Sequence, residues 1–440
     1  MDFRRVIALV VLPIGVYAGT TYEVRLDQGE KNPSSVFCTN DLVFVQGFRM
    51  EERLLPRQMW EVWGVKTETT WCLRWQTEKD VLYDHDRKPG QRDFRAFPEE
   101  MFVEWMHDFR YFVTVGKKKW DMSEGFFYKP MLLWADYDGY RRYGEGFYMV
   151  KGEVRLGDVK LSGYVVPSRF WEEKSTNEWY DCFQNATTNW LGGGAFSCLI
   201  GGVTLKGLSL WEWTKEGKFP VSKYAISSAW SWERWTFYTE ASYKNGVRLT
   251  VPGFDGREET NVPFPGITNI TPGKYEFSER NGSFFRMFWN VLVGIRAELP
   301  WDVTLRCEVL YRERSWNDEE RKAYWDGVRY AESRYKNELY FVVPETYLLL
   351  AAGHLSFDTY APWMVSLGFT KTIGDHWEIS QDVTTELSTY SWRWQGGITW
   401  KSLSLWEVRL SVSVVGGERY TLFGEMVEKT HWQLSLSSSL

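Results

Sequence analysis

Residues 284–314 read FFRMFWNVLVGIRAELPWDVTLRCEVLYRER, and apolar and polar side chains alternate in both arms of this stretch. Successive side chains of a β-strand point to opposite faces of the sheet, so a period of two predicts two strands joined by a turn at Leu299-Pro300. Proline suits the turn because it has no N–H to donate to a neighbouring strand. One predicted face is apolar and comprises Met287, Trp289, Val291, Val293, Ile295, Ala297, Val303, Leu305, Cys307, Val309 and Tyr311.

The arms are long for a globular protein. At about 3.3 Å per residue, an arm of about 14 residues reaches roughly 46 Å, whereas strands of globular proteins usually end near 17–20 Å. Tilted by roughly 40°, such an arm covers the ~25 Å apolar band of a membrane barrel. We interpret the pair as two walls of a membrane β-barrel, apolar towards lipid and charged towards the lumen. Two long strands of a soluble sheet are the alternative.

Composition is compatible with both interpretations. The 440 residues are 44% hydrophobic and 25% charged, with a formal net charge of −6 and a mean hydropathy of −0.40. A barrel is hydrophilic on average because its apolar residues occupy only alternate positions. Aromatic residues make up 18% of the chain, including 26 Trp, and both membrane interfaces and carbohydrate-binding proteins are rich in Trp. The acidic balance argues against nucleic-acid binding.

Residues 1–18 have the features of a secretory signal peptide. Arg4-Arg5 precede an apolar stretch at 6–16, and Val16-Tyr17-Ala18 forms a small-residue cleavage site. Beyond it no apolar run reaches the ~18–20 residues of a membrane-spanning helix. We expect one domain over residues 19–440, in which residues 19–57 form an amino-terminal plug or the first strands.

Connections between the expected strands alternate in length. Gly157-Asp158 is a two-residue hairpin turn between strands at 147–156 and 159–168. The segment 244–283, rich in Pro and Gly, is long enough to fold inward as a constriction or lid. Short connections are expected at 157–158, 206–208, 299–300, 373–375 and 401–403, and long ones after residues 170, 243 and 315. The two kinds fall at opposite ends, as the periplasmic turns and outer loops of outer-membrane barrels do. Before residue 120 the pattern is weaker, with candidate strands at 41–50, 59–68, 69–77 and 101–115.

A 14-residue pattern occurs twice. Residues 201–214 read GGVTLKGLSLWEWT and residues 396–409 read GGITWKSLSLWEVR, with nine identical positions. Three-residue turns at 206–208 and 401–403 keep matching faces together, since a shift of one residue exchanges the two faces of a strand. The second copy would then place Trp400, Ile398, Trp406, Val408 and Leu410 on one face. Duplication of a hairpin and convergence on a common composition are both open.

The chain ends in an alternating strand at 431–440, with Trp432, Leu434, Leu436 and Leu440 on one face. Together with the signal and residues 125–440, this strand resembles the closing strand of bacterial outer-membrane β-barrel proteins, in which a terminal aromatic stands where Leu440 stands here. Within that class the size is similar to that of long-chain fatty-acid transporters, whose Asn-Pro-Ala motif has Asn32-Pro33-Ser34 as its counterpart. The resemblance implies a closed antiparallel barrel with an even number of strands, about 16–18. It also implies contact with outer-membrane lipid, and with the barrel-assembly machinery through the C-terminal strand.

No motif for enzyme chemistry is present. The sequence contains no GxSxG, HExxH, P-loop or zinc spacing. Asp382 and Glu386 lie about 13 Å apart along one strand, too far for a paired acid and base. We therefore expect no enzymatic activity, no cofactor and no metal site. Of the five cysteines, Cys307 is expected to be unpaired, and a Cys182–Cys198 bond is one option.

The lumen is expected to carry charges of both signs, which favour the passage of polar solutes or form salt bridges that stiffen the wall. Tryptophans at strand ends are expected to form the membrane girdle. The predicted lumen residues are Arg286, Arg296, Glu298, Asp302, Arg306, Glu308, Arg312, Arg314, Glu378, Asp382, Glu386, Glu407 and Arg409. The predicted girdle residues are Trp235, Trp289, Trp377, Trp406 and Trp432.

These features predict an exported outer-membrane channel that passes small polar solutes. A transporter of hydrophobic, fatty-acid-like substrates on the same scaffold is one alternative. A secreted Trp-rich glycan-binding β-protein, with its apolar flank packed against a second sheet, is the other.

Overall fold

The computed structural model describes residues 17–31, 34–35, 37, 48–62, 65–79, 92–129, 147–167, 190–213, 221–244, 249–253, 276–280, 288–313, 316, 318–337, 348, 351, 360–402, 406–426 and 428–439. Residues 1–16, which include most of the predicted signal peptide, lie outside this set, so the signal and the domain boundary stay predictions.

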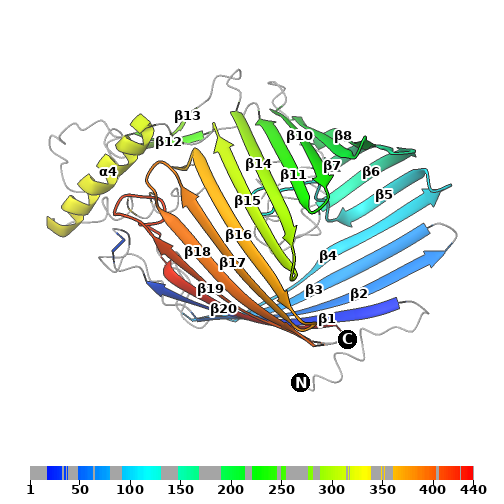
Figure 1. Cartoon of the computed structure of the whole chain (residues 1–440), viewed down its shortest axis with the longest axis horizontal. Coiled ribbons are helices and arrows are strands. Elements are labelled where there is room, and N and C mark those ends of the chain that lie inside the picture. The colour runs from blue at the N-terminus through cyan, green and yellow to red at the C-terminus, as the bar shows by residue number, and fades with distance from the viewer. Residues whose placement is uncertain are drawn as a thin grey trace, which may run out of the picture.

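Eighteen antiparallel strands form one closed ring (Figure 1). Each strand pairs with the next one along the chain, and β1 closes the ring by pairing with both β2 and β20. The strands are β1 (Tyr17–Lys31), β2 (Phe48–Val62), β3 (Val65–Lys79), β4 (Arg92–His107), β5 (Tyr111–Lys118), β6 (Phe147–Leu156), β7 (Val159–Pro167), β8 (Trp190–Ile200), β9 (Val203–Trp213), β10 (Val221–Trp232), β11 (Trp235–Lys244), β14 (Phe288–Leu299), β15 (Val303–Arg312), β16 (Trp363–Ile373), β17 (Trp377–Glu386), β18 (Trp392–Lys401), β19 (Trp406–Gly416) and β20 (Glu428–Ser439). The predicted closed barrel with an even number of strands is confirmed.

The predicted pair at 284–314 forms β14 and β15, with Arg296 opposite Arg306 and Val293 opposite Val309. Val293 is 57% exposed on the outward face, whereas Glu308 on the inward face is fully buried. Residues that lie opposite each other on neighbouring strands point to the same face of the sheet. The pairing register therefore assigns inward and outward residues on every strand of the ring. Apart from the short β12–β13 pair, all described strands belong to this ring, so no second sheet covers the apolar flank as the glycan-binding alternative required.

Short and long connections lie at opposite ends of the barrel, as predicted. Two-residue turns join β6 to β7 at 157–158 and β8 to β9 at 201–202, and long connections follow β5, β7, β11 and β15. The turn predicted at 206–208 is wrong: residues 206–208 lie within β9, and the turn is formed by Gly201-Gly202, which adopt positive φ. The long connection expected after residue 170 ends before Trp190, where β8 begins.

The repeated pattern therefore does not mark a duplicated hairpin. The first Gly-Gly forms a turn, whereas Gly396-Gly397 lie in the middle of β18. The faces predicted for the second copy are correct, since Ile398 is opposite Leu410 and Trp400 is opposite Val408. Similar sequences thus take two positions in the barrel because strand pairing, not local sequence, sets the register.

Residues 19–31 lie in β1 and residues 48–57 in β2, so these parts of the segment 19–57 are wall strands. Several strands predicted in this region begin and end at other residues in the structure. The stretch 59–68 spans the end of β2 and the start of β3, and 101–115 spans β4, its turn and β5. Cys198, on the outward face of β8, and Cys307 are free thiols, so the Cys182–Cys198 bond is not formed.

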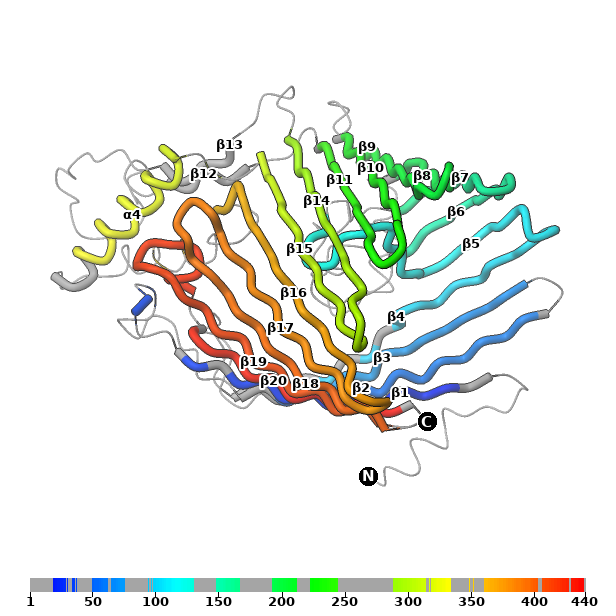
Figure 2. Tube along the Cα trace, in the orientation of Figure 1, coloured from blue at the N-terminus to red at the C-terminus, as the bar shows by residue number. Residues whose placement is uncertain are grey.

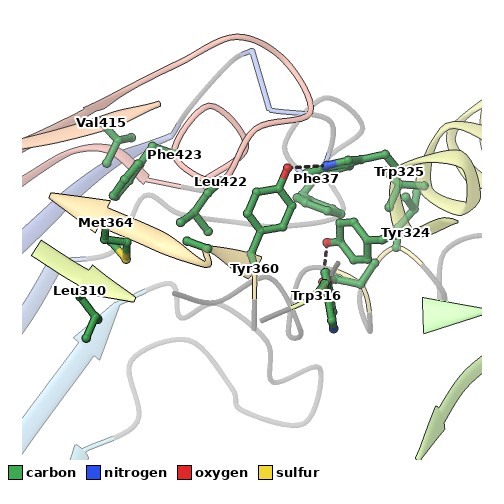
Figure 3. Packing of buried hydrophobic residues seen from close by; sticks show 14 of the residues in the cluster. Phe37, Leu310, Trp316, Tyr324, Trp325, Tyr360, Met364, Val415, Leu422 and Phe423 are labelled. Carbon is green, nitrogen blue, oxygen red and sulfur yellow. Dashed lines mark hydrogen bonds between the residues drawn. The ribbon is translucent and has the colours of Figure 1, made fainter. Parts of the chain in front are cut away.

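A hydrophobic cluster fills the loop end of the barrel beneath helix α4 (Asp318–Asn337) (Figure 3). The indole of Trp325 donates a 2.9 Å hydrogen bond to the Tyr360 hydroxyl, and Arg419 of the β19–β20 loop pairs with Glu332 at 2.6 Å. No helix among the described residues has the length and hydropathy needed to cross a membrane. This loop-end cluster comprises Phe37, Tyr238, Leu292, Leu310, Trp316, Tyr324, Trp325, Val328, Ala331, Leu348, Ala351, Tyr360, Ala361, Met364, Val415, Leu422 and Phe423.

The described parts of segment 244–283 form a two-stranded sheet, β12 (Leu249–Gly253) with β13 (Glu276–Arg280). This sheet lies beside α4 at the loop end (Figure 1). The constriction predicted from this segment is formed in the described structure by another connection, the one that follows β5.

We expect Val293→Arg to destabilise the barrel by ~2–4 kcal/mol, the cost of placing Arg on the lipid face near the bilayer midplane. Urea unfolding in phospholipid vesicles measures this change. Ser437→Arg is the matched control, because Ser437 faces inward beside Glu23 and Glu407 and should change stability little. Equal destabilisation by the two substitutions would contradict the assignment of the faces.

Candidate functional site

Residues 119–129 leave β5 and run inside the ring, behind β14 and β15 in the view of Figure 2. Their main anchor is Glu308, a fully buried carboxylate on the inward face of β15. It accepts hydrogen bonds from the backbone N–H groups of Phe126, Phe127 and Tyr128 at 2.5, 2.9 and 3.1 Å. The Tyr238 hydroxyl of β11 donates a fourth bond at 2.6 Å. A buried carboxylate is stable only when such donors replace its water.

A second buried carboxylate, Glu240 on β11, holds the preceding part of this lumen segment. It accepts the backbone N–H of Gly125 at 2.9 Å, the N–H of Glu124, and the Ser123 hydroxyl at 2.7 Å. Lys206 of β9 pairs with the Glu124 carboxylate and donates to the carbonyl of Met122 at 3.3 Å. Two wall strands therefore fix the backbone of five consecutive residues, 124–128.

The start of the lumen segment covers an apolar part of the wall. Trp120 and Met122 pack against it, and the Trp120 ring meets Tyr164 edge-on at 5.1 Å. The Lys151 ammonium lies 4.6 Å from the centre of the Trp120 ring. The covered wall residues are Met149, Tyr164, Val166, Ala195, Leu208, Leu210 and Ala225.

The end of the lumen segment carries aromatic side chains against the wall. Phe126 is 50% exposed, and the Arg306 guanidinium lies 3.8 Å from the centre of its ring. A Cβ at Gly368 would lie 2.6 Å from the Phe127 ring and from Asp382 Oδ1, so a side chain there would displace one of the two. Burial raises the pKa of the Tyr128 phenol above its ordinary value, and its hydroxyl lies 2.8 Å from that of Ser366.

The anchoring bonds determine which backbone groups face the passage. In a trans peptide the C=O points away from the N–H. Because the N–H groups of residues 124–128 point to the wall, the carbonyls of residues 123–127 point away from it, towards the lumen. The lumen segment therefore presents hydrogen-bond acceptors, while Arg306 and the wall arginines present donors.

Nine of the predicted lumen residues lie on the inward face by register: Arg296, Glu298, Arg306, Glu308, Arg312, Glu378, Asp382, Glu407 and Arg409. Arg286 and Arg314 lie outside the described residues. The prediction for Asp302 is wrong, because it lies in the β14–β15 turn with φ 56°. Glu386 is also inward but fully buried, and it accepts the N–H groups of Ser388 and Thr389 at 2.7 and 2.8 Å. It stabilises a loop instead of lining the passage.

The inward residues have different partners. Arg306 has Asp382 and Glu378 as acidic electrostatic neighbours, and Asp382 also faces Arg393 and Arg409. Arg296 pairs with Glu298 at 2.5 Å, and Lys401 with Glu378 at 2.9 Å. Salt bridges are therefore present in the wall, and a role of the inward charges in selectivity stays a proposal.

The lumen segment and Glu240 were not among the predicted residues, although the alternation in β11 (Trp235-Thr236-Phe237-Tyr238-Thr239-Glu240) places Glu240 inward. The inward charges of the first strands were also not among them. These charges form pairs such as Arg57 with Glu68 at 2.7 Å and Arg25 with Asp27 at 3.1 Å. Among the described residues, no group of three His, Cys, Asp or Glu side chains could hold a metal ion.

The predicted girdle tryptophans all lie on the outward face and are between 39% and 49% exposed. Trp235, Trp377 and Trp406 are the first residues of strands that begin at the short-turn end, whereas Trp289 and Trp432 lie near the loop end. Their role as a membrane girdle stays a proposal.

No protein family matches the chain, and no curated protein matches it in sequence. Among solved structures, OccK5 (OpdH) of Pseudomonas aeruginosa is similar, with a TM-score of 0.52 and 7% identity over 97% of this chain and 98% of that chain. OccK7 (OpdD) of the same organism is similar with a TM-score of 0.51 and 8% identity over 96% and 98%. A triple mutant of Rhodopseudomonas blastica porin has a TM-score of 0.42 and 12% identity over 97% and 100%. The first two likenesses show that the chain shares their fold.

We expect Glu308→Ala to widen the passage. The substitution leaves three backbone donors and one hydroxyl without an acceptor, and each unsatisfied buried donor costs ~1–3 kcal/mol, so the lumen segment should leave the wall. Single-channel recording in planar bilayers should give a conductance several-fold above that of the unmodified protein. Glu407→Ala is the control, since Glu407 faces the lumen without touching the lumen segment. An unchanged Glu308→Ala conductance would mean that residues 119–129 do not limit the passage.

Proposed function

We propose that this protein is a channel of the outer membrane that passes small polar solutes without catalysing a reaction. One observation carries the proposal: a closed ring of strands has a charged inward face, and a segment fixed by two buried carboxylates narrows its lumen. Such a ring satisfies every strand's backbone groups within itself, as a wall in contact with lipid must.

The chemistry of the narrowing favours polar solutes. Arginine N–H groups on the wall and backbone carbonyls on the lumen segment offer both kinds of hydrogen-bonding partner to a solute that leaves bulk water. An apolar solute makes no hydrogen bonds with these groups. It would also have to displace water from the charged side chains, which costs free energy that nothing repays. The similarity in fold to OccK5 and OccK7 is consistent with this proposal. Export through the signal at residues 1–18 and assembly through the C-terminal strand belong to the same proposal.

Neither alternative function is supported by a specific observation. Asn32-Pro33, the counterpart of the fatty-acid-transporter motif, lie outside the described residues. The exposed Phe126 ring of the lumen segment lies against the Arg306 guanidinium, so this surface is not purely apolar. The apolar part of the wall is covered by Trp120 and Met122. For a glycan-binding protein the apolar face would need a second layer, and the described strands provide none.

The proposal is tested by the purified protein in planar lipid bilayers. We expect stepwise conductance in salt solution from folded protein, whose migration on gels changes on heating, and none from the heat-denatured sample. A folded barrel that gives no conductance steps at any applied voltage would refute a channel.

We expect Arg306→Gln to shift ion selectivity towards cations, because it removes a positive charge from the narrowing. The reversal potential under a salt gradient measures the shift. Lys371→Gln removes the same charge from the outward face of β16 and should leave the potential unchanged. Equal shifts from the two substitutions would show that Arg306 does not line the ion path.

A further inference from the structure

The outward face of β1–β3 differs in chemistry from the faces around it. By register, Thr20 of β1, Gln58 of β2 and Thr67 and Thr69 of β3 point outward, and Gln58 lies directly opposite Thr69. None of these four side chains makes a hydrogen bond to another described residue, and Gln58 is exposed. By contrast, the outward hydroxyl of Thr239 on β11 donates a 2.9 Å hydrogen bond to the carbonyl of Leu292 in the wall.

Gln58 lies at a distance from the turn where the outward residues of several other strands are apolar. It is the fifth residue from the turn at the end of β2, one outward position deeper than Trp60. At the same distance from the turn, β4, β8, β14 and β16 carry Val103, Phe196, Ile295 and Phe369, whereas β10 and β17 carry the polar residues Ser228 and Gln381. A lone outward amide such as Gln381 is therefore not distinctive, but on β1–β3 four polar side chains lie together. Hydrocarbon offers no partner to such a group, so lipid is a poor occupant for this patch.

The backbone is irregular at the same place. Pro56 lies in the middle of β2, and the pairing of β2 with β3 is interrupted at residues 55 and 56. The β3–β4 register shifts between Thr70 and Trp71, one strand away. Proline within a sheet is confined to edges and bulges, and bulges redirect side chains. The irregularity thus lies directly beneath the polar patch.

The same sector is also the tallest part of the wall. Strands β1–β4 have 15 or 16 residues, whereas the others in the ring have 8 to 12. Tilted by roughly 40°, a strand of 15 residues rises roughly 38 Å, well beyond the ~25 Å apolar band. The outward surface of this sector therefore continues past the membrane, where a protein can contact it and lipid cannot.

We infer that the outward face of β1–β3 is a contact surface for a second copy of this chain. An amide carries both a donor and an acceptor, and so do hydroxyl groups. Such groups complement themselves when the same patch of a neighbouring copy faces them across a symmetry axis. Trp60 and Trp71, 47% and 38% exposed, flank the patch and supply the large aromatic contacts that protein interfaces favour.

The test uses cross-linking in the membrane, with a parent chain whose five cysteines are replaced by alanine. In this parent, Gln58→Cys is treated with a short bismaleimide and should give a covalent dimer. Gln381→Cys is the matched control, because Gln381 is an exposed outward amide equally far from its own turn, on β17. No dimer from Gln58→Cys, or as much dimer from Gln381→Cys, would overturn the inference.

A second measurement needs no substitution. The mass of the unmodified protein in lipid nanodiscs should correspond to two or more chains, and Gln58→Leu should shift the population towards one chain. A single chain at every protein concentration would refute self-association. Conductance per barrel is a separate readout, so the channel proposal and this contact can fail independently.

Discussion

Backbone hydrogen bonding is the constraint on which the rest of this structure depends. A sheet in contact with hydrocarbon cannot leave N–H and C=O groups unpaired, and only a closed ring removes both edges. Here closure is made by β1, which pairs with β2 along one side and with β20 along the other, so the first and last strands meet in one seam. Closure in turn defines an inside and an outside, and the period of two then assigns every wall residue to one of them.

A wall of this kind has no central hydrophobic core, so other interactions must order its interior. The buried carboxylates of Glu308 and Glu240 order the interior by accepting hydrogen bonds from backbone N–H groups of the lumen segment. A carboxylate is suited to this task because its two oxygens take several donors at once. The apolar side chains that remain gather at two places, under Trp120 and Met122 and in the loop-end cluster below α4.

The features that follow from local alternation were predictable from sequence. In β14 and β15 apolar residues occupy the outward positions and polar residues most of the inward ones, so the faces and the inward positions of Arg306 and Glu308 could be assigned. The turn itself lies at residues 300–302 and not at Leu299-Pro300. The position of Gly201-Gly202 could not, because LKGLSL reads equally well as a turn or as a continuous strand, and only pairing with β8 and β10 decides. The placement of Asp302 failed for a related reason, since all three residues of the turn 300–302 leave the alternation of the strands.

Long-range contacts were beyond the sequence argument. Residues 119–129 carry no periodic pattern, and their place in the lumen depends on acceptors more than a hundred residues away in β11 and β15. The segment 244–283 has the length and the Pro and Gly content of a constriction, yet its described parts pair with each other beside α4. Composition showed that a loop was long enough to enter the lumen but could not show which loop finds partners there.

The central claim is that lipid covers one face of the wall strands and water the other. It is tested most directly by single cysteines at each position of β15 in cysteine-free protein in membranes, treated with a water-soluble maleimide. The account predicts labelling that alternates with a period of two, high at exposed inward positions and absent at Leu305 and Val309. Uniform labelling, or strong labelling of the apolar positions, would contradict it.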